Sequence, residues 1–191
     1  MAINFSGFGT QTQPSGWQKI SESHSSSTVD NIILDNLHTT GQTVNYRGFK
    51  LIGSFVPVSD QAYLYAYWRE GSTTHSSNNY HWGKQGSYPS DNEYLQSQSS
   101  QNHMRLINNG GSQSHEGQRV NLEFYPQTST LANNIGNWMS WTTIRLDGST
   151  NFRTETGGGY YDGNNQMTGL MLQYNTGQIS VHGYTLWGLT H

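Results

Sequence analysis

Residues 120–124 read Val-Asn-Leu-Glu-Phe, and this stretch decides the fold class of the protein. Val120, Leu122 and Phe124 are apolar, whereas Asn121 and Glu123 between them are polar. Successive side chains of a β-strand point to opposite faces of a sheet, so a period of two indicates a strand that buries one face. The stretch therefore predicts a sheet with a core on one side.

Similar segments recur along the chain at fairly even spacing. The sequence predicts about nine strands, at residues 31–37, 44–56, 62–69, 101–107, 118–125, 139–146, 150–155, 167–174 and 178–189. In the third segment Tyr63, Tyr65 and Tyr67 alternate with smaller apolar residues. The tyrosines therefore share one face, which either packs between layers or lines an exposed surface.

Glycine and asparagine between these segments predict tight turns, among them Gly157-Gly158-Gly159 and Asp162-Gly163. One short helix is predicted near residues 91–98, because Ser90 and Glu93 have the spacing of a capping box. Good surface helix formers are otherwise scarce. We therefore expect an all-β fold, a two-sheet antiparallel jelly-roll sandwich.

The chain has 191 residues, which fits one domain, because all-β sandwiches of this size need not divide. Only 11% of the residues are charged, which could indicate disorder, but 6 Trp, 12 Tyr and 6 Phe exclude that possibility. Residues 1–30 are rich in Ser, Thr, Gly and Gln and are expected to form an N-terminal arm or edge segment. Residues 31–191 are expected to form a single jelly-roll domain.

The composition also limits the classes of partner that we expect for this chain. The formal net charge is -3 and Lys and Arg total 9, too few for a basic stripe that neutralises many phosphates, so nucleic acid is not an expected partner. Membrane insertion is not expected, because no apolar run approaches about 18 residues and the first residues do not resemble a signal peptide. The chain has 0 Cys, which rules out disulfides and thiolate metal sites.

A series of short motifs occurs in a recognisable order: Trp17, Ile32-Ile33-Leu34, Tyr46-Arg47-Gly48-Phe49-Lys50-Leu51, Val120-Asn121-Leu122-Glu123-Phe124, Met167-Thr168-Gly169-Leu170, Gly177 and Tyr184-Thr185-Leu186-Trp187-Gly188-Leu189. In this order the chain, over residues 17–191, resembles a family of virion proteins of tailed phages that infect marine bacteria and cyanobacteria. Members close with a strand of the form small-x-Leu-aromatic-Gly-aliphatic. They more often have Leu-Tyr-Gly there, so Trp187 is a conservative departure.

The resemblance implies a concanavalin-like jelly roll in a tail-fibre, baseplate or head-decoration protein, located on the virion. Its partners would be other virion proteins and further copies of the same chain, a homo-oligomer for which a trimer is one expectation. The family has no catalytic signature that could be transferred to residues of this chain.

The residues that could carry catalysis or bind a metal do not form a convincing pattern. Glycoside hydrolysis needs two carboxyl groups about 5–9.5 Å apart, but Glu123 and Glu155 are not paired on one strand, and both are expected to be solvated.

The eight His residues lack the spacing of a catalytic zinc site. His75 and His81 are expected in an exposed loop, with a metal site on a fibre trimer axis as the alternative. Asp162-Gly163-Asn164-Asn165 is expected to be a plain turn rather than a calcium site. We expect no catalytic residue, no metal and no cofactor.

Two loop-like segments combine aromatic rings with short polar side chains: Tyr160, Tyr161, Asp162 and Asn164 in the first, and Tyr80, Trp82 and Tyr88 in the second. Aromatic faces can stack on sugar rings while carboxyl and amide groups hydrogen-bond to hydroxyls. The segments are therefore candidate glycan-binding loops. The alternative is that their rings pack on a neighbouring subunit.

The leading hypothesis is a phage virion structural protein, a surface-exposed jelly-roll module of a tail fibre or capsid that recognises host-surface glycans. The alternative is a capsid decoration or cement protein that binds no ligand and adheres to the shell through its N-terminal arm. A glycan depolymerase is the least favoured class, because it would need convergent carboxylates in a cleft.

Overall fold

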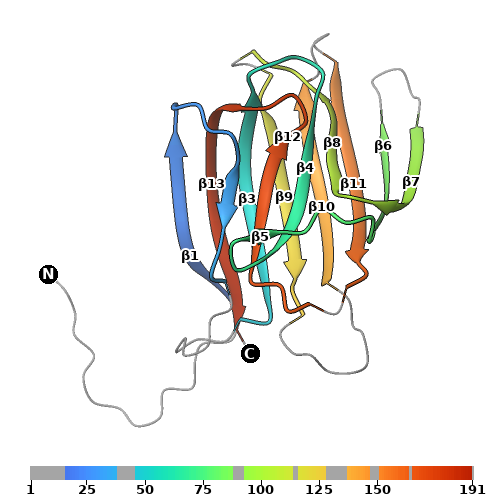
Figure 1. Ribbon diagram of the computed structural model, residues 1–191. Coiled ribbons are helices and arrows are strands. Elements are labelled where there is room, and N and C mark those ends of the chain that lie inside the picture. The colour runs from blue at the N-terminus through green and yellow to red at the C-terminus, as the bar shows by residue number, and fades with distance from the viewer. Residues whose placement is uncertain are drawn as a thin grey trace, which may run out of the picture.

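The computed structural model describes residues 16–37, 46–87, 93–113, 116–127, 137–146, 151–163 and 165–190. In these ranges it has 13 strands and no helix, and every strand pair is antiparallel. The strands form two sheets packed face to face (Figure 1). The prediction of an all-β, two-sheet sandwich is confirmed. Among the described residues no helix is long and apolar enough to cross a bilayer.

The larger sheet has eight strands in the order β1-β13-β3-β9-β10-β11-β6-β7. Their bounds are β1 Gly16–Ser25, β3 Gly48–Pro57, β6 Tyr80–Ser87, β7 Glu93–Gln101, β9 Gln118–Tyr125, β10 Asn137–Leu146, β11 Phe152–Tyr161 and β13 Ile179–Thr190. The smaller sheet has the order β2-β12-β4-β5, and β8 also pairs with β4. Its strands are β2 Ile32–Leu34, β4 Ala62–Glu70, β5 Thr73–Thr74, β8 Met104–Gly110 and β12 Gly169–Tyr174. The chain passes repeatedly from one sheet to the other, as in jelly rolls.

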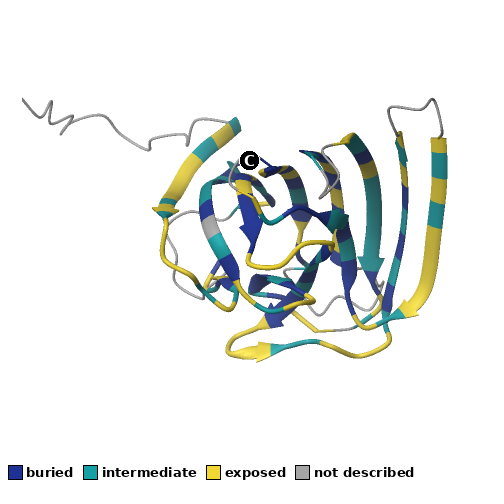
Figure 2. Ribbon diagram, turned by 90° about the horizontal axis from the view of Figure 1, so that it is seen from above, coloured by how far each residue is buried: buried dark blue, intermediate teal, exposed yellow. Residues whose placement is uncertain are grey.

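The core lies between the two sheets, and the period-two pattern of β9 is realised there. Val120, Leu122 and Phe124 are fully buried, whereas Asn121 is exposed. Figure 2 shows similar changes between buried and exposed residues along several strands. In β4 the residues between the tyrosines, Ala62, Leu64 and Ala66, are also fully buried. The tyrosine row of β4 therefore lies on the outer face of the smaller sheet, half-buried.

Each of the nine predicted segments contains a strand, but β1, β5, β6 and β7 were not predicted, so the prediction of about nine strands was too low. The helix predicted near residues 91–98 is wrong: residues 93–101 form β7, which pairs with β6. Ser and Gln favour strands weakly, so the hydrogen-bonded ladder along β6 decides the conformation of this segment. Residues 16–25, at the end of the predicted arm or edge segment, form β1 and pair with β13.

The turn predicted at residues 157–159 is also wrong, because all three glycines lie within β11. None of them has a positive φ. A Cβ on Gly157 would lie 2.4 Å from the Trp141 ring, and one on Gly159 would lie 2.7 Å from the sulfur of Met104. These two glycines therefore make room for core side chains rather than bend the backbone.

Candidate functional site

The two predicted glycan-binding loops are neighbouring strands. β6 pairs with β11, so that Tyr160 stands opposite His81 and Tyr161 stands opposite Tyr80. Because side chains alternate along each strand, the rings separate onto two faces. Tyr80, Trp82 and Tyr161 point into the core and are 0%, 3% and 3% exposed. The expectation that these three side chains lie in exposed loops is wrong.

The buried rings have structural partners. The hydroxyl of Tyr80 donates to the backbone carbonyl of His75 at 2.7 Å and accepts from the backbone N–H of Trp68 at 2.9 Å. His75 itself is half-buried against the Tyr161 ring, with Nε2 3.4 Å from the Glu70 carboxylate. Tyr80, Trp82 and Tyr161 are therefore not accessible to a sugar that approaches from solvent.

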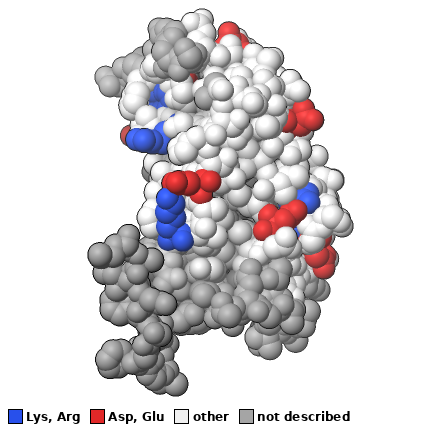
Figure 3. Space-filling view, turned by 90° about the vertical axis from the view of Figure 1, so that its left-hand side faces the viewer, with Lys and Arg blue, Asp and Glu red and all other residues white. Residues whose placement is uncertain are grey.

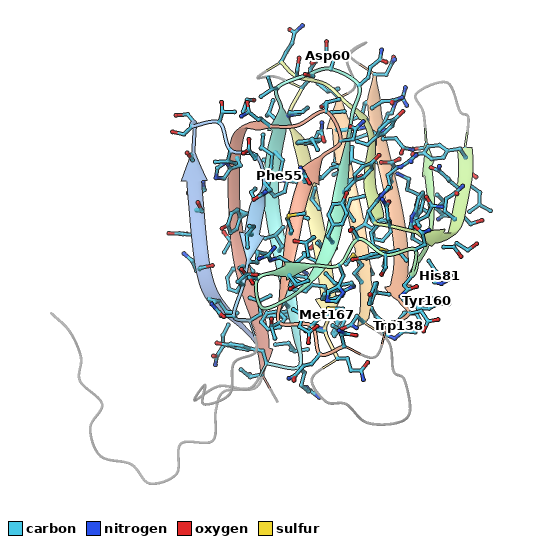
Figure 4. The ribbon with its side chains drawn as sticks, in the orientation of Figure 1. Phe55, Asp60, His81, Trp138, Tyr160 and Met167 are labelled. Atoms are coloured by element: carbon cyan, nitrogen blue, oxygen red, sulfur yellow. The ribbon has the colours of Figure 1, made fainter. Side chains whose placement is uncertain are left out.

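The outer face of the larger sheet carries the accessible rings. Tyr160 stacks on His81 with ring centroids 4.8 Å apart and an interplanar angle of 12°, and its centroid lies 5.1 Å from that of Trp138. Figure 4 shows these three side chains together near one end of the sheet. Tyr125 continues the row on β9, opposite Trp138. We call His81, Tyr160, Trp138 and Tyr125 the aromatic row.

Of these four residues, sequence reasoning named Tyr160 as a glycan-binding candidate and His81 only as a loop residue or metal ligand, whereas His81 lies within β6. Each member comes from a different strand: His81 from β6, Tyr160 from β11, Trp138 from β10 and Tyr125 from β9. Only the strand register places them side by side. A usable signal in the sequence was that Trp138 shares one face of a strand with the polar residues Ser140 and Thr142, which favours an outward direction for Trp138.

The polar members of the predicted site lie elsewhere or outside the described residues. Asp162 follows the end of β11 and is exposed, and its N–H donates to the carbonyl of Asn79 at 2.8 Å. Asn164 and Tyr88 lie outside the described residues. In the part of the chain that is described, no three His, Asp or Glu side chains are grouped closely enough to hold a metal.

Glu155 is not the solvated residue that was expected. It is buried on the inner side of the larger sheet, with Lys84 Nζ 3.1 Å from its carboxylate and with Arg145 as a second ion-pair partner. The Tyr94 hydroxyl also donates to this carboxylate. Two buried cations thus share one carboxylate, and we call these four residues the buried ion cluster.

Burial and charge act in opposite directions in this cluster. Burial lowers the pKa of Lys84 to about 8, although the Glu155 carboxylate raises it. Burial would raise the pKa of Glu155, but the charges of Lys84 and Arg145 outweigh burial and hold this pKa below its ordinary value. Glu155 is therefore ionised at neutral pH and acts as the counterion of the two cations.

Glu123 and Glu155 do not form a hydrolytic pair. Glu123 is half-buried on the outer face, 3.0 Å from Lys50 Nζ, and accepts the Tyr125 hydroxyl at 3.2 Å. Glu155 faces the opposite side of the same sheet. Two carboxylates on opposite faces cannot flank one glycosidic bond.

The tyrosine row of β4 offers few free ring faces. The His103 ring stacks on Tyr65 with centroids 3.7 Å apart, and the Arg105 guanidinium lies 4.9 Å from the Tyr63 centroid. Burial, with a smaller effect of Arg105, lowers the pKa of His103 to about 4, so this imidazole is neutral at physiological pH. Because its rings are covered by neighbours, this surface is a weaker candidate than the aromatic row.

Charged groups are sparse on the surface. In the view of Figure 3, from the β1 side, a few acidic and basic side chains, some of them next to one another, are separated by broad areas without charged residues. No known protein family, curated protein or solved structure matches the chain. The geometry of the aromatic row and the sequence motifs therefore carry the functional argument.

Proposed function

We propose that the chain is a carbohydrate-binding β-sandwich module on the surface of a phage virion, and that the aromatic row contacts the sugar. The observation that carries the binding proposal is Trp138, which is 48% exposed in the middle of a row of rings on a sheet face. Contiguous exposed aromatic side chains mark interaction surfaces. Strands also hold side chains in place more firmly than loops do, which favours recognition of a defined shape.

The virion setting is proposed from the order of the sequence motifs. Other virion proteins and further copies of this chain are the proposed partners. The sheet edge at β7 supports self-association, because Leu95 on this last strand is 83% exposed. Exposed edge strands readily pair with another chain.

A matched pair of tryptophan variants tests the binding proposal. Wild-type protein is applied to an array of bacterial surface glycans beside Trp138→Ala and Trp17→Ala. Trp17 is 37% exposed on β1, at the opposite edge of the same sheet. We expect Trp138→Ala to lose binding and Trp17→Ala to keep it. Equal binding by all three proteins would contradict the assignment of the site.

The alternative of a capsid decoration protein without a ligand is favoured by the exposed β7 edge, which suits contacts between subunits. Immunogold labelling of intact particles separates the two functions. Label on the tail or fibres supports receptor recognition, label over the head supports decoration, and particles without label contradict the virion proposal. Release of new reducing ends from host polysaccharide would instead support a depolymerase.

A further inference from the structure

A groove crosses the outer face of the larger sheet beside the aromatic row. Its floor is a row of small residues brought together by the strand register: Ser97 on β7, Gly83 on β6, Gly158 on β11 and Ser140 on β10. Gly83, Gly158 and Ser140 each lie two residues along their strand from a member of the aromatic row. The aromatic row forms one wall of the groove. The groove encloses about 570 Å³ and is open to solvent.

Nothing in the fold requires glycine at the two central floor positions. Gly83 and Gly158 do not have positive φ. A Cβ on Gly158 would meet only the Met139 carbonyl, at 3.5 Å, and one on Gly83 would come no closer than 3.7 Å to any atom. These are ordinary contacts, in contrast to the 2.4 Å clash at Gly157. Glycine weakens a strand interior, and it commonly marks the close approach of a ligand or another backbone.

Among the described residues, the lining of the groove contains no acidic, lysine or arginine side chain. Its lining residues include Ser97, Ser99, Ser140 and His81. An acidic polymer would find no lysine or arginine side chain along the floor to replace its hydration. The accessible lining is otherwise mostly apolar. Aromatic ring faces beside a few serine hydroxyls suit a neutral ligand whose sugar rings present both C–H faces and hydroxyl groups.

The dimensions suit a chain rather than a single ring. The four floor residues lie on four adjacent strands, so the floor is about 14 Å long at a strand spacing of about 4.8 Å. At one end the groove reaches β7, the last strand of the sheet. Beyond Ser140 the same row continues to Glu123, whose ion pair with Lys50 bounds the other end.

We propose that this groove binds a linear, uncharged polysaccharide that lies across β7, β6, β11 and β10, directly on the backbone of Gly83 and Gly158. The inference rests on the proposed carbohydrate-binding function and names its ligand class. The aromatic row flanks the sugar chain, and the two glycines allow it to approach the sheet. A side chain at either glycine would occupy the space of the ligand.

Affinity electrophoresis tests this proposal in native gels containing dextran, mannan or soluble starch, and in matched gels containing alginate or polygalacturonate. The variants are Gly83→Thr and Gly158→Thr, with Gly117→Thr as control, because a Cβ at Gly117 meets open space and this residue is outside the groove. Threonine favours strands, so thermal unfolding should show that the two groove variants are at least as stable as wild type.

We expect retardation by at least one uncharged polysaccharide. Each groove variant should bind it at least about tenfold more weakly, because the added side chain clashes with the ligand, whereas Gly117→Thr should bind like wild type. Binding that survives both groove variants but is lost in Trp138→Ala would overturn the groove and leave the proposed function standing. Retardation by acidic polymers alone would overturn the ligand class. An absence of retardation in every gel, together with an empty glycan array, would overturn both.

Discussion

Replacing Lys84 by Met is expected to stabilise the protein, although Lys84 belongs to a buried ion cluster. Burial lowers the pKa of Lys84 from its ordinary 10.5 to about 8, despite the opposing attraction of Glu155. A tenfold change in proton affinity is worth about 1.4 kcal/mol, so the charged ammonium costs the folded state about 3 kcal/mol at neutral pH. Lys84→Met removes this cost and leaves Glu155 paired with Arg145. The free energy of unfolding should rise by at most about 3 kcal/mol.

Urea unfolding followed by tryptophan fluorescence measures this change, provided that the m-value stays constant. Glu155→Gln is the matched control, because it keeps the shape of the side chain but leaves two buried cations without their carboxylate. It should destabilise the protein by about 3–5 kcal/mol. If Lys84→Met proves less stable than wild type by more than about 1 kcal/mol, the attraction of Glu155 outweighs the burial of Lys84 and the reasoning is refuted.

The pH dependence gives a second check on the same residue. The pKa of Lys84 is lower in the folded state than in the unfolded state, so between about pH 8 and 10.5 the unfolded chain binds more protons. The contribution of Lys84 to stability must therefore increase as the pH rises through this window. The stability advantage of Lys84→Met over wild type should shrink over the same window. An advantage that stays constant with pH would not come from the charge of Lys84.

Three further predictions concern single side chains. Trp138→Ala should abolish carbohydrate binding and cost only about 1 kcal/mol of stability, because the half-exposed ring loses little more than its contact with Tyr160; a glycan array and thermal unfolding measure the two effects. Gly157→Ala should destabilise the protein by about 1–3 kcal/mol through overpacking against Trp141, and a melting temperature equal to that of wild type would contradict this packing. Leu95→Lys should weaken self-association at the β7 edge, as measured by sedimentation velocity, whereas a wild-type protein that sediments as a monomer at every concentration would rule out edge pairing.

The strands that sequence patterns predicted are those whose residues alternate between core and solvent or bury long apolar runs. β9 and β4 belong to this group, and their alternation is realised in the burial of the structure. β6 and β7 do not, because their glycine, serine and glutamine residues resemble loops or a helix start. Their conformation depends on backbone pairing with β11 and with each other, which no local pattern reports.

The candidate site was only partly accessible to sequence reasoning. Tyr160 was named for its aromatic neighbours in the chain, but one of these, Tyr161, points into the core, because adjacent residues of a strand face opposite ways. The residues that do stand beside Tyr160 are Trp138 and His81, on two other strands. The glycine run was interpreted as a turn because glycine permits turns, whereas here it provides space for the Trp141 ring.

The sequence by itself determined that the chain folds as an all-β sandwich with neutral polar surfaces, because residue alternation and composition are local properties that burial and solvation act on directly. Only the tertiary structure decided which aromatic rings reach solvent, which glycines are free and why Glu155 is ionised in the core. These properties depend on register and on the layer that covers each sheet face. Register joins residues far apart in the chain, and a shift of one residue would exchange every inner side chain with an outer one.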